Sequence, residues 1–234
     1  MQNTYSKDFI GSVTDVHAAH PDPVYSKGED LFNAISHVVG GALGIVFAII
    51  AFCMASENPS SNKFLAIAIY SFSVITLYTM SALYHFLPQG STAKRIFRIF
   101  DHCTIFILIA GCYTPFCLIT FWNEPIGKII FGVEWGVAVL GITFNAINMH
   151  WKAVKILSQI GYVVMGWMIV FVVRRLVESV SLACFLWLLA GGVFYTVGIL
   201  FYALGKKKKY MHCVWHVFVL IGSILQFVSI LYLL

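Results

Sequence analysis

The chain has 234 residues, of which 60% are hydrophobic and only 11% charged, and its mean hydropathy is +0.86. These values exclude an ordinary water-soluble domain, which carries more charge and less apolar character. The formal net charge of +5 does not indicate a nucleic-acid partner, because the basic residues lie between apolar runs and form no continuous stripe. We therefore expect an all-α integral membrane protein.

The first 30 residues are polar and mixed in charge, and Pro21 and Pro23 break any helix there. The apolar run that follows is too long for the central region of a cleavable signal peptide. Residues 1–30 are therefore predicted to be a cytosolic tail, and residues 31–234 a seven-helix transmembrane domain.

Apolar runs of roughly 20 residues, the length that crosses a bilayer core, recur along the remaining chain. They predict seven spans, at residues 31–54, 63–87, 101–121, 127–147, 155–173, 182–204 and 211–233. The connections are short, so we expect a compact bundle in which successive helices run up and down.

Lysines and arginines are distributed unevenly between the two ends of these spans. Eleven of the 15 lie in the tail and in the loops after the second, fourth and sixth spans, and the other four lie on the opposite side. The positive-inside rule then places the N-terminus in the cytoplasm and the C-terminus outside.

This orientation brings chemically active side chains to the cytoplasmic leaflet. Ser81 and His85, one helical turn apart, close the second span, and Asp101 opens the third. His212 and His216, also one turn apart, open the seventh span.

A second polar stripe, formed by Glu29, Asn33 and His37, opens the first span on the same side. The other half of the domain is poor in polar residues, and Glu134 and Gln226 are its main exceptions. We therefore expect the functional site near the cytoplasmic face.

Three imidazoles with one open position make a suitable catalytic zinc site, and His85, His212 and His216 are the predicted ligands. Iron, nickel and copper also accept imidazole, so ligand type alone leaves the metal open. Cys213 is the nearby sulfur, but it points about 100° away from His212 around the helix.

Two further side chains are predicted to complete a catalytic centre. Asp101 is the carboxylate expected to hold and deprotonate a zinc-bound water, whose pKa the metal lowers towards ~7. Ser81 is expected to hydrogen-bond that water or a substrate oxyanion.

Other features predict packing. Gly40 and Gly191 lie in small-residue clusters that allow helices to approach closely, and Pro115 is expected to kink the third span.

The combined motifs resemble those of bacterial hemolysin III proteins, which are similar to progestin and adipoQ receptors (including adiponectin receptors) and more remotely to alkaline ceramidases. The matching runs cover all seven spans: Glu29-x3-Asn33-x3-His37, Ser81-x3-His85, Phe100-Asp101-His102, Ala110 to Pro115, Met165-Gly166-Trp167, Gly191 to Gly198 and His212-x3-His216. Two positions depart from many bacterial relatives, which carry an acidic residue in place of Cys213 and a histidine in place of Gln226.

The resemblance implies one Zn²⁺ held by the same three histidines, with Asp101 contacting it through water and Ser81 nearby. It also implies a multi-pass protein of the bacterial inner membrane, with membrane lipids as partners and a lipid amide or fatty-acyl ligand inside the bundle. Whether the protein is an enzyme stays open at this point.

Three functions remain as hypotheses. The first is a zinc-dependent hydrolase of lipid amides or esters, linked to membrane lipid homeostasis. The second is a non-enzymatic membrane regulator or sensor with a structural zinc. The third is a cytolysin, which suits the sequence least because compact apolar helices indicate residence in the producer's own membrane.

Overall fold

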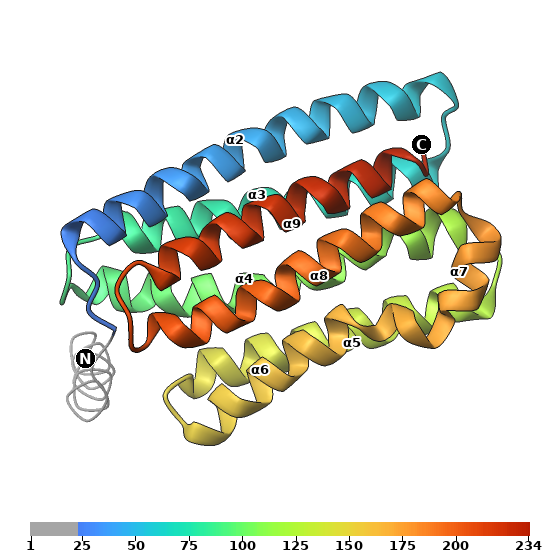
Figure 1. Ribbon diagram of the computed structural model, residues 1–234. Coiled ribbons are helices and arrows are strands. Elements are labelled where there is room, and N and C mark those ends of the chain that lie inside the picture. The colour runs from blue at the N-terminus through green and yellow to red at the C-terminus, as the bar shows by residue number, and fades with distance from the viewer. Residues whose placement is uncertain (1–22) are drawn as a thin grey trace, which may run out of the picture.

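A computed structural model describes residues 23–234 as a bundle of long helices (Figure 1). Seven helical segments of this part of the chain are long and apolar enough to cross a membrane, which confirms the predicted number of spans. They are α2 (Lys27–Glu57), α3 (Ser61–Phe86), α4 (Thr92–Pro115) continued by the π-helix η1 (Phe116–Thr120), α5 (Pro125–Asn148), α6 (Lys152–Gly166) continued by the 3-10 helix η2 (Met168–Val172) and α7 (Val173–Ser179), α8 (Leu182–Gly205) and α9 (Met211–Leu231). The prediction for residues 1–22 lies outside the described residues.

Successive helices are antiparallel neighbours because their connections are short. α2 packs against α3, α3 against α4, α4 against α5 and α5 against α6, while α9 lies between α8 and α2. α2, α4, α6 and α9 begin at one end of the bundle, on the left of Figure 1, and we call it the histidine end. The opposite end, where the chain terminates after α9, is the far end.

The bundle has its apolar surface outside and many polar groups inside. Phe171, Leu182 and Ile147 expose 85%, 66% and 65% of their surface, whereas Asn33 and Glu134 are fully buried. This inverted pattern suits a hydrocarbon surrounding, in which exposed apolar side chains carry no penalty and polar groups are sequestered between helices.

Several helices begin earlier than the hydropathy pattern predicts, and the difference is largest for α2 and α4. α2 begins at Lys27 rather than residue 31, because Ser26 and Glu29 form a reciprocal capping box at its N-terminus. α4 begins at Thr92 rather than residue 101, and Ser91 caps it by accepting a hydrogen bond from the Lys94 backbone. The basic residues before Asp101 are therefore helical, and Asp101 lies in the third turn instead of at the helix start.

The fifth span is interrupted rather than continuous. α6 ends at Gly166, and the chain continues as a 3-10 helix before α7. The Tyr113 hydroxyl donates to the Gly166 carbonyl and accepts from the Ile169 backbone N–H, both at 3.0 Å. A neighbouring side chain thus satisfies backbone groups that the break leaves free, as a break inside a membrane requires. The irregularity expected at Pro115 takes the form of the π-helix that follows it.

Small residues allow close helix contacts at the predicted positions. A side chain at Gly40 would collide with the ring of Tyr78 on α3, and one at Gly191 would lie 2.9 Å from the Gln226 amide on α9. These glycines bring α2 and α8 close to the helices that carry the site.

Candidate metal centre and adjoining cavities

The three predicted histidine ligands come together at the histidine end. His85 lies in the last turn of α3, and His212 and His216 occupy the first two turns of α9. One ring nitrogen from each residue lies within 4.8 Å of the others, and all three side chains are buried. The sequence prediction that these imidazoles meet is therefore confirmed, and the cluster could hold a metal ion.

The positions of the ring nitrogens are compatible with a cation bound between the three imidazoles. The Nε2 atoms of His212 and His216 are 3.0 Å apart, and the Nε2 of His85 is buried without a hydrogen-bond partner among the described residues. Buried polar nitrogens normally have partners, so three imidazoles with ring nitrogens this close together suggest a shared ligand. Imidazole suits zinc, iron, nickel and copper, and the residues therefore fit a metal without identifying it.

The start of α9 is held in place by the first span. Tyr210, the residue before the helix, adopts a left-handed conformation with φ of 62°. Its backbone N–H donates to Glu29 Oε1 at 2.6 Å, and the other Glu29 oxygen completes the α2 capping box. Glu29 therefore fixes where His212 begins its turn and does not face the cluster as a ligand.

Asp30 is a site residue that was not predicted from the sequence. Its Oδ1 lies 2.9 Å from His85 Nδ1, and its Oδ2 accepts hydrogen bonds from Gln89 Nε2 at 2.6 Å and Lys94 Nζ at 3.1 Å. A proton on Nδ1 that is held by this carboxylate leaves the Nε2 lone pair for a metal, the usual arrangement around metal-binding histidines. The Ser26-x2-Glu29 capping signal could have placed Asp30 on a helix instead of in the tail.

Lys94 balances the buried carboxylate of Asp30. Its side chain is 4% exposed, and its ammonium group also donates to the Leu87 carbonyl at 3.1 Å. A buried charge needs such compensation. The Asp30–Lys94 pair therefore keeps the carboxylate oriented toward His85.

Ser81 and Asp101 line the same small cavity as two of the histidines. This cavity has a volume of about 60 Å³, and His212 and His216 form part of its wall. The volume is sufficient for water. Asp101 Oδ2 lies 3.8 Å from His102 Nδ1, and the hydroxyl-bearing Ser81 is one turn before His85. The structure thus gathers these predicted residues around one space, while their catalytic roles stay predictions.

Two aromatic contacts enclose the cluster. The ring of Tyr25, just before α2, stacks on His212 with centroids 4.8 Å apart, and burial raises the pKa of its hydroxyl. On the other side, the His37 ring lies 3.9 Å from His216 and meets the Tyr78 ring edge-on. Tyr25 was not predicted from sequence, since nothing in its local pattern distinguishes it.

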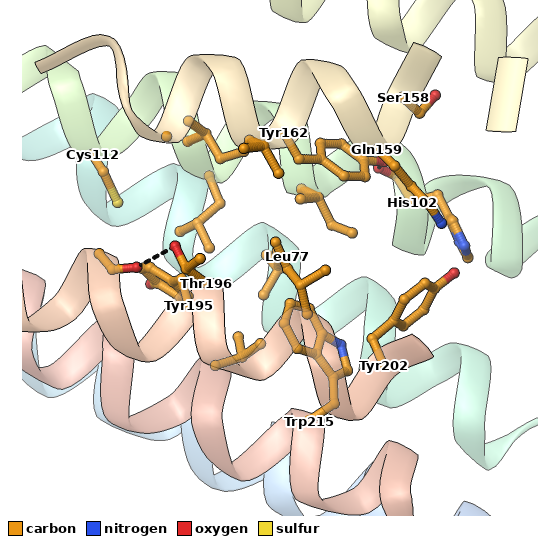
Figure 2. Close-up of a pocket in the computed structure, with 18 of the residues that line it drawn as sticks. Leu77, His102, Cys112, Ser158, Gln159, Tyr162, Tyr195, Thr196, Tyr202 and Trp215 are labelled. Atoms are coloured by element: carbon orange, nitrogen blue, oxygen red, sulfur yellow. Dashed lines mark hydrogen bonds between the residues drawn. The ribbon is translucent and has the colours of Figure 1, made fainter. Parts of the chain in front are cut away.

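A larger cavity of about 570 Å³ adjoins the small one (Figure 2). It lies between α4 and α6 on one side and α8 and α9 on the other, with His102 and Tyr202 facing each other at one end and Cys112 and Tyr195 at the other. His102, Tyr202, His212 and Trp215 line both cavities, among other shared residues. An elongated, mostly apolar space therefore leads to the polar cluster.

Comparison with known proteins gives consistent matches over most of the chain. A family model described as "Haemolysin-III related" matches residues 25–227. Hemolysin-3 of Bacillus cereus is 37% identical over 204 residues, covering 87% of this chain and 91% of that protein. The Hemolysin-3 homolog of Bacillus subtilis (strain 168) is 36% identical over 209 residues, covering 89% and 96%. The human monocyte to macrophage differentiation factor is 23% identical over 171 residues, covering 69% and 67%.

Proposed function

Because the chain belongs to the Haemolysin-III related family and joins three buried imidazoles to an acyl-sized cavity, we propose that it is a zinc-dependent hydrolase of lipid amides or esters. The observation that carries this proposal is the small cavity, which Ser81, Asp101, His212 and His216 line together. Bound zinc would supply Lewis-acid activation of a water molecule or a carbonyl oxygen there.

The remaining work of hydrolysis falls to side chains around that cavity. Asp101 takes a proton from the attacking water, whose oxygen bonds to the carbonyl carbon, and returns that proton to the departing nitrogen or oxygen as the amide or ester bond breaks. The Ser81 hydroxyl donates a hydrogen bond to the carbonyl oxygen of the substrate as negative charge develops on that oxygen. The products are a fatty acid and the free amine or alcohol.

The large cavity supports a lipid as the substrate. It is elongated, mostly apolar and within the roughly 300–1,000 Å³ range of small-molecule sites. Its shared wall with the small cavity would place an acyl chain in the apolar space while the scissile bond lies near His212.

We further propose that the histidine end faces the cytoplasm of a bacterial plasma membrane. The lysine and arginine distribution supports this orientation, and two of the similar proteins come from Bacillus species. Single cysteines introduced at Lys207 and at Glu178, in a variant without native cysteines, test it. A membrane-impermeant thiol reagent added to intact cells should label the Glu178→Cys protein alone, and the reverse labelling would overturn the orientation.

Hydrolysis is tested with purified protein whose metal content has been measured. We expect about one zinc per chain, release of fatty acid from a lipid amide or ester, and loss of that release on chelation. Asp101→Asn should abolish turnover while zinc content is retained, and Ser81→Ala should lower turnover roughly 10²–10³-fold. Ser71→Ala, which removes another buried hydroxyl of α3, is the matched control. Undiminished turnover by Asp101→Asn would reject the mechanism.

A second function is favoured by the position of the histidines, which connect α3 to α9. In a regulator or sensor the metal would only brace these helices. Chelation would then lower the melting temperature, and no lipid product would form with any substrate. The name of the Bacillus relatives points to cytolysis as a third candidate function. It is tested by measuring the haemoglobin that purified, detergent-free protein releases from red blood cells.

A further inference from the structure

The large cavity has an uneven distribution of charge. Its charged lining residues among the described part of the chain are all basic: Arg98, Lys155 and Lys206. They come from α4, α6 and the residue after α8, and all lie at the histidine end. The rest of the wall is mostly apolar or carries neutral polar groups. The charged side chains that line this end of the apolar space are therefore basic, and the carboxylate of Asp101 lines the adjoining small cavity instead.

The three cations line the same end of one cavity. Lys155 lies within electrostatic range of both Arg98 and Lys206, although like charges repel. Lys206 Nζ sits 5.2 Å from the centre of the Tyr202 ring, which itself lines both cavities. A multivalent anion that binds among basic side chains can accept charge-assisted hydrogen bonds from several of them at once.

The cavity is long enough to hold an acyl chain. Its wall follows α4 from Arg98 to Phe116, a distance of roughly 27 Å at ~1.5 Å per residue. An acyl chain spans one leaflet, about half of the ~30 Å hydrocarbon core. A chain could therefore extend into the apolar part while its headgroup stays at the basic end.

From this juxtaposition we propose that the large cavity binds an acyl lipid with a phosphate headgroup, held by Arg98, Lys155 and Lys206. A phosphate monoester carries about −1.5 to −2 charge and three acceptor oxygens, so it matches three cations better than a single carboxylate does. The proposal rests on the proposed function in taking this cavity as the place of the substrate's acyl chain. It adds the substrate class, a phosphate-bearing lipid instead of a neutral amide.

The basic end of the large cavity also adjoins the small cavity in which we propose that hydrolysis takes place. Arg98 lies one turn before Asp101 and lines both cavities, as does Tyr202, one turn before Lys206. A phosphate at the basic end would therefore leave the first bonds of the acyl linkage beside the small cavity. A lipid whose phosphate and acyl group share one glycerol unit fits this order of headgroup site and small cavity.

The test uses an ether-linked lysophosphatidic acid, which has a phosphate monoester and an alkyl chain but no acyl ester or amide bond that the proposed hydrolase could cleave. Its binding to the purified zinc-loaded protein is measured calorimetrically beside three probes: the matching ether-linked phosphocholine, palmitate, and glycerol 3-phosphate. We expect the phosphate monoester lipid to bind at least tenfold more tightly than each of the others. Equal binding of the phosphocholine or palmitate would overturn the phosphate headgroup, and equal binding of glycerol 3-phosphate would overturn the lipid.

Paired variants distinguish the cavity lysines from general surface charge. Lys155→Gln with Lys206→Gln should weaken the phosphate monoester lipid roughly ten- to thirtyfold and remove its preference over phosphocholine. Lys152→Gln with Lys208→Gln makes the same change of net charge at the same end, at lysines outside the cavity lining, and should leave binding unaltered. An equal loss in both pairs would show that the lysines only attract anionic lipid to the surface, and would overturn the proposal.

Failure of this inference differs from failure of the proposed function. A bound ether lipid without turnover of any acyl lipid rejects the hydrolase and leaves the binding site standing. Turnover of neutral amides, with equal affinity for phosphate and phosphocholine probes, does the reverse.

Discussion

The histidine end and the far half of the bundle hold buried polar groups in different ways. At the histidine end, three imidazoles from α3 and α9 cluster together, and side chains from α2, α3, α4 and α9 line one small cavity. In the far half, buried groups join helices in pairs: Ser229 donates to the Cys184 carbonyl at 2.7 Å, and Trp135 donates to Thr114 at 3.1 Å. Glu134 is buried there with no hydrogen-bond partner among the described residues.

This difference indicates that the buried polar groups of the two ends have different roles, stabilising the bundle in the far half and forming a candidate ligand site at the histidine end. A pairwise hydrogen bond satisfies its two partners and needs no ligand, whereas the buried Nε2 of His85 has no hydrogen-bond partner among the described residues and lies beside two other imidazoles that could share a ligand with it. The cluster at the histidine end could therefore hold a ligand, and the far half provides internal controls of similar burial.

The largest effect should follow from removing the two α9 imidazoles. His212→Ala with His216→Ala leaves one of the three ligands, so metal content should fall from about one per chain to near zero, measured by elemental analysis of purified protein. The melting temperature should fall with it, because metal binding stabilises the folded state. Ser223→Ala, a buried change two turns further along α9, should retain the metal. Full metal content in the double variant would place the metal elsewhere.

Asp30→Asn should give the next largest effect. The amide keeps the shape of the side chain but loses the negative charge that orients His85, so metal affinity should fall about 10- to 100-fold in a competition with a chelator. Asp30→Glu should recover part of the affinity, since it restores the carboxylate. Asp101→Asn serves as the matched control, because it removes a carboxylate of the same site that is not bonded to a ligand imidazole. Equal losses in both variants would show a general charge effect instead of positioning.

In the far half, replacing Glu134 should raise stability, in contrast to the losses expected at the histidine end. Replacing a buried polar group that has no partner with an apolar one removes a desolvation penalty, so Glu134→Met should raise stability by about 1–3 kcal/mol, seen as a higher melting temperature. Metal content should not change. A marked loss of stability would mean that the carboxyl group has a structural partner or a bound ion.

The sequence predicts the apolar features of the fold more completely than its polar contacts. Hydropathy predicts the seven crossings and, with helical spacing, the meeting of His85, His212 and His216. It misses helix turns rich in charge, such as the start of α4, because a cap at Ser91 stabilises them and apolar character does not. Tyr25 and Asp30 escape prediction because their contacts with the histidines are tertiary, and the break at Gly166 depends on Tyr113 from another helix.

The smallest effect is expected at Cys213, beside His212 but on a different face of α9. Its thiol donates to the Glu29 carbonyl at 3.8 Å, and it does not line either cavity. Cys213→Ala should therefore leave metal content unchanged and lower stability by no more than about 1 kcal/mol, since it loses one weak hydrogen bond. The measurement is elemental analysis together with the absorption spectrum of the cobalt-substituted protein, in which a thiolate ligand gives a strong charge-transfer band. Such a band in the unaltered protein, absent from Cys213→Ala, would show that α9 turns its sulfur toward the metal. The histidine end would then hold a metal with four protein ligands, the fourth being Cys213.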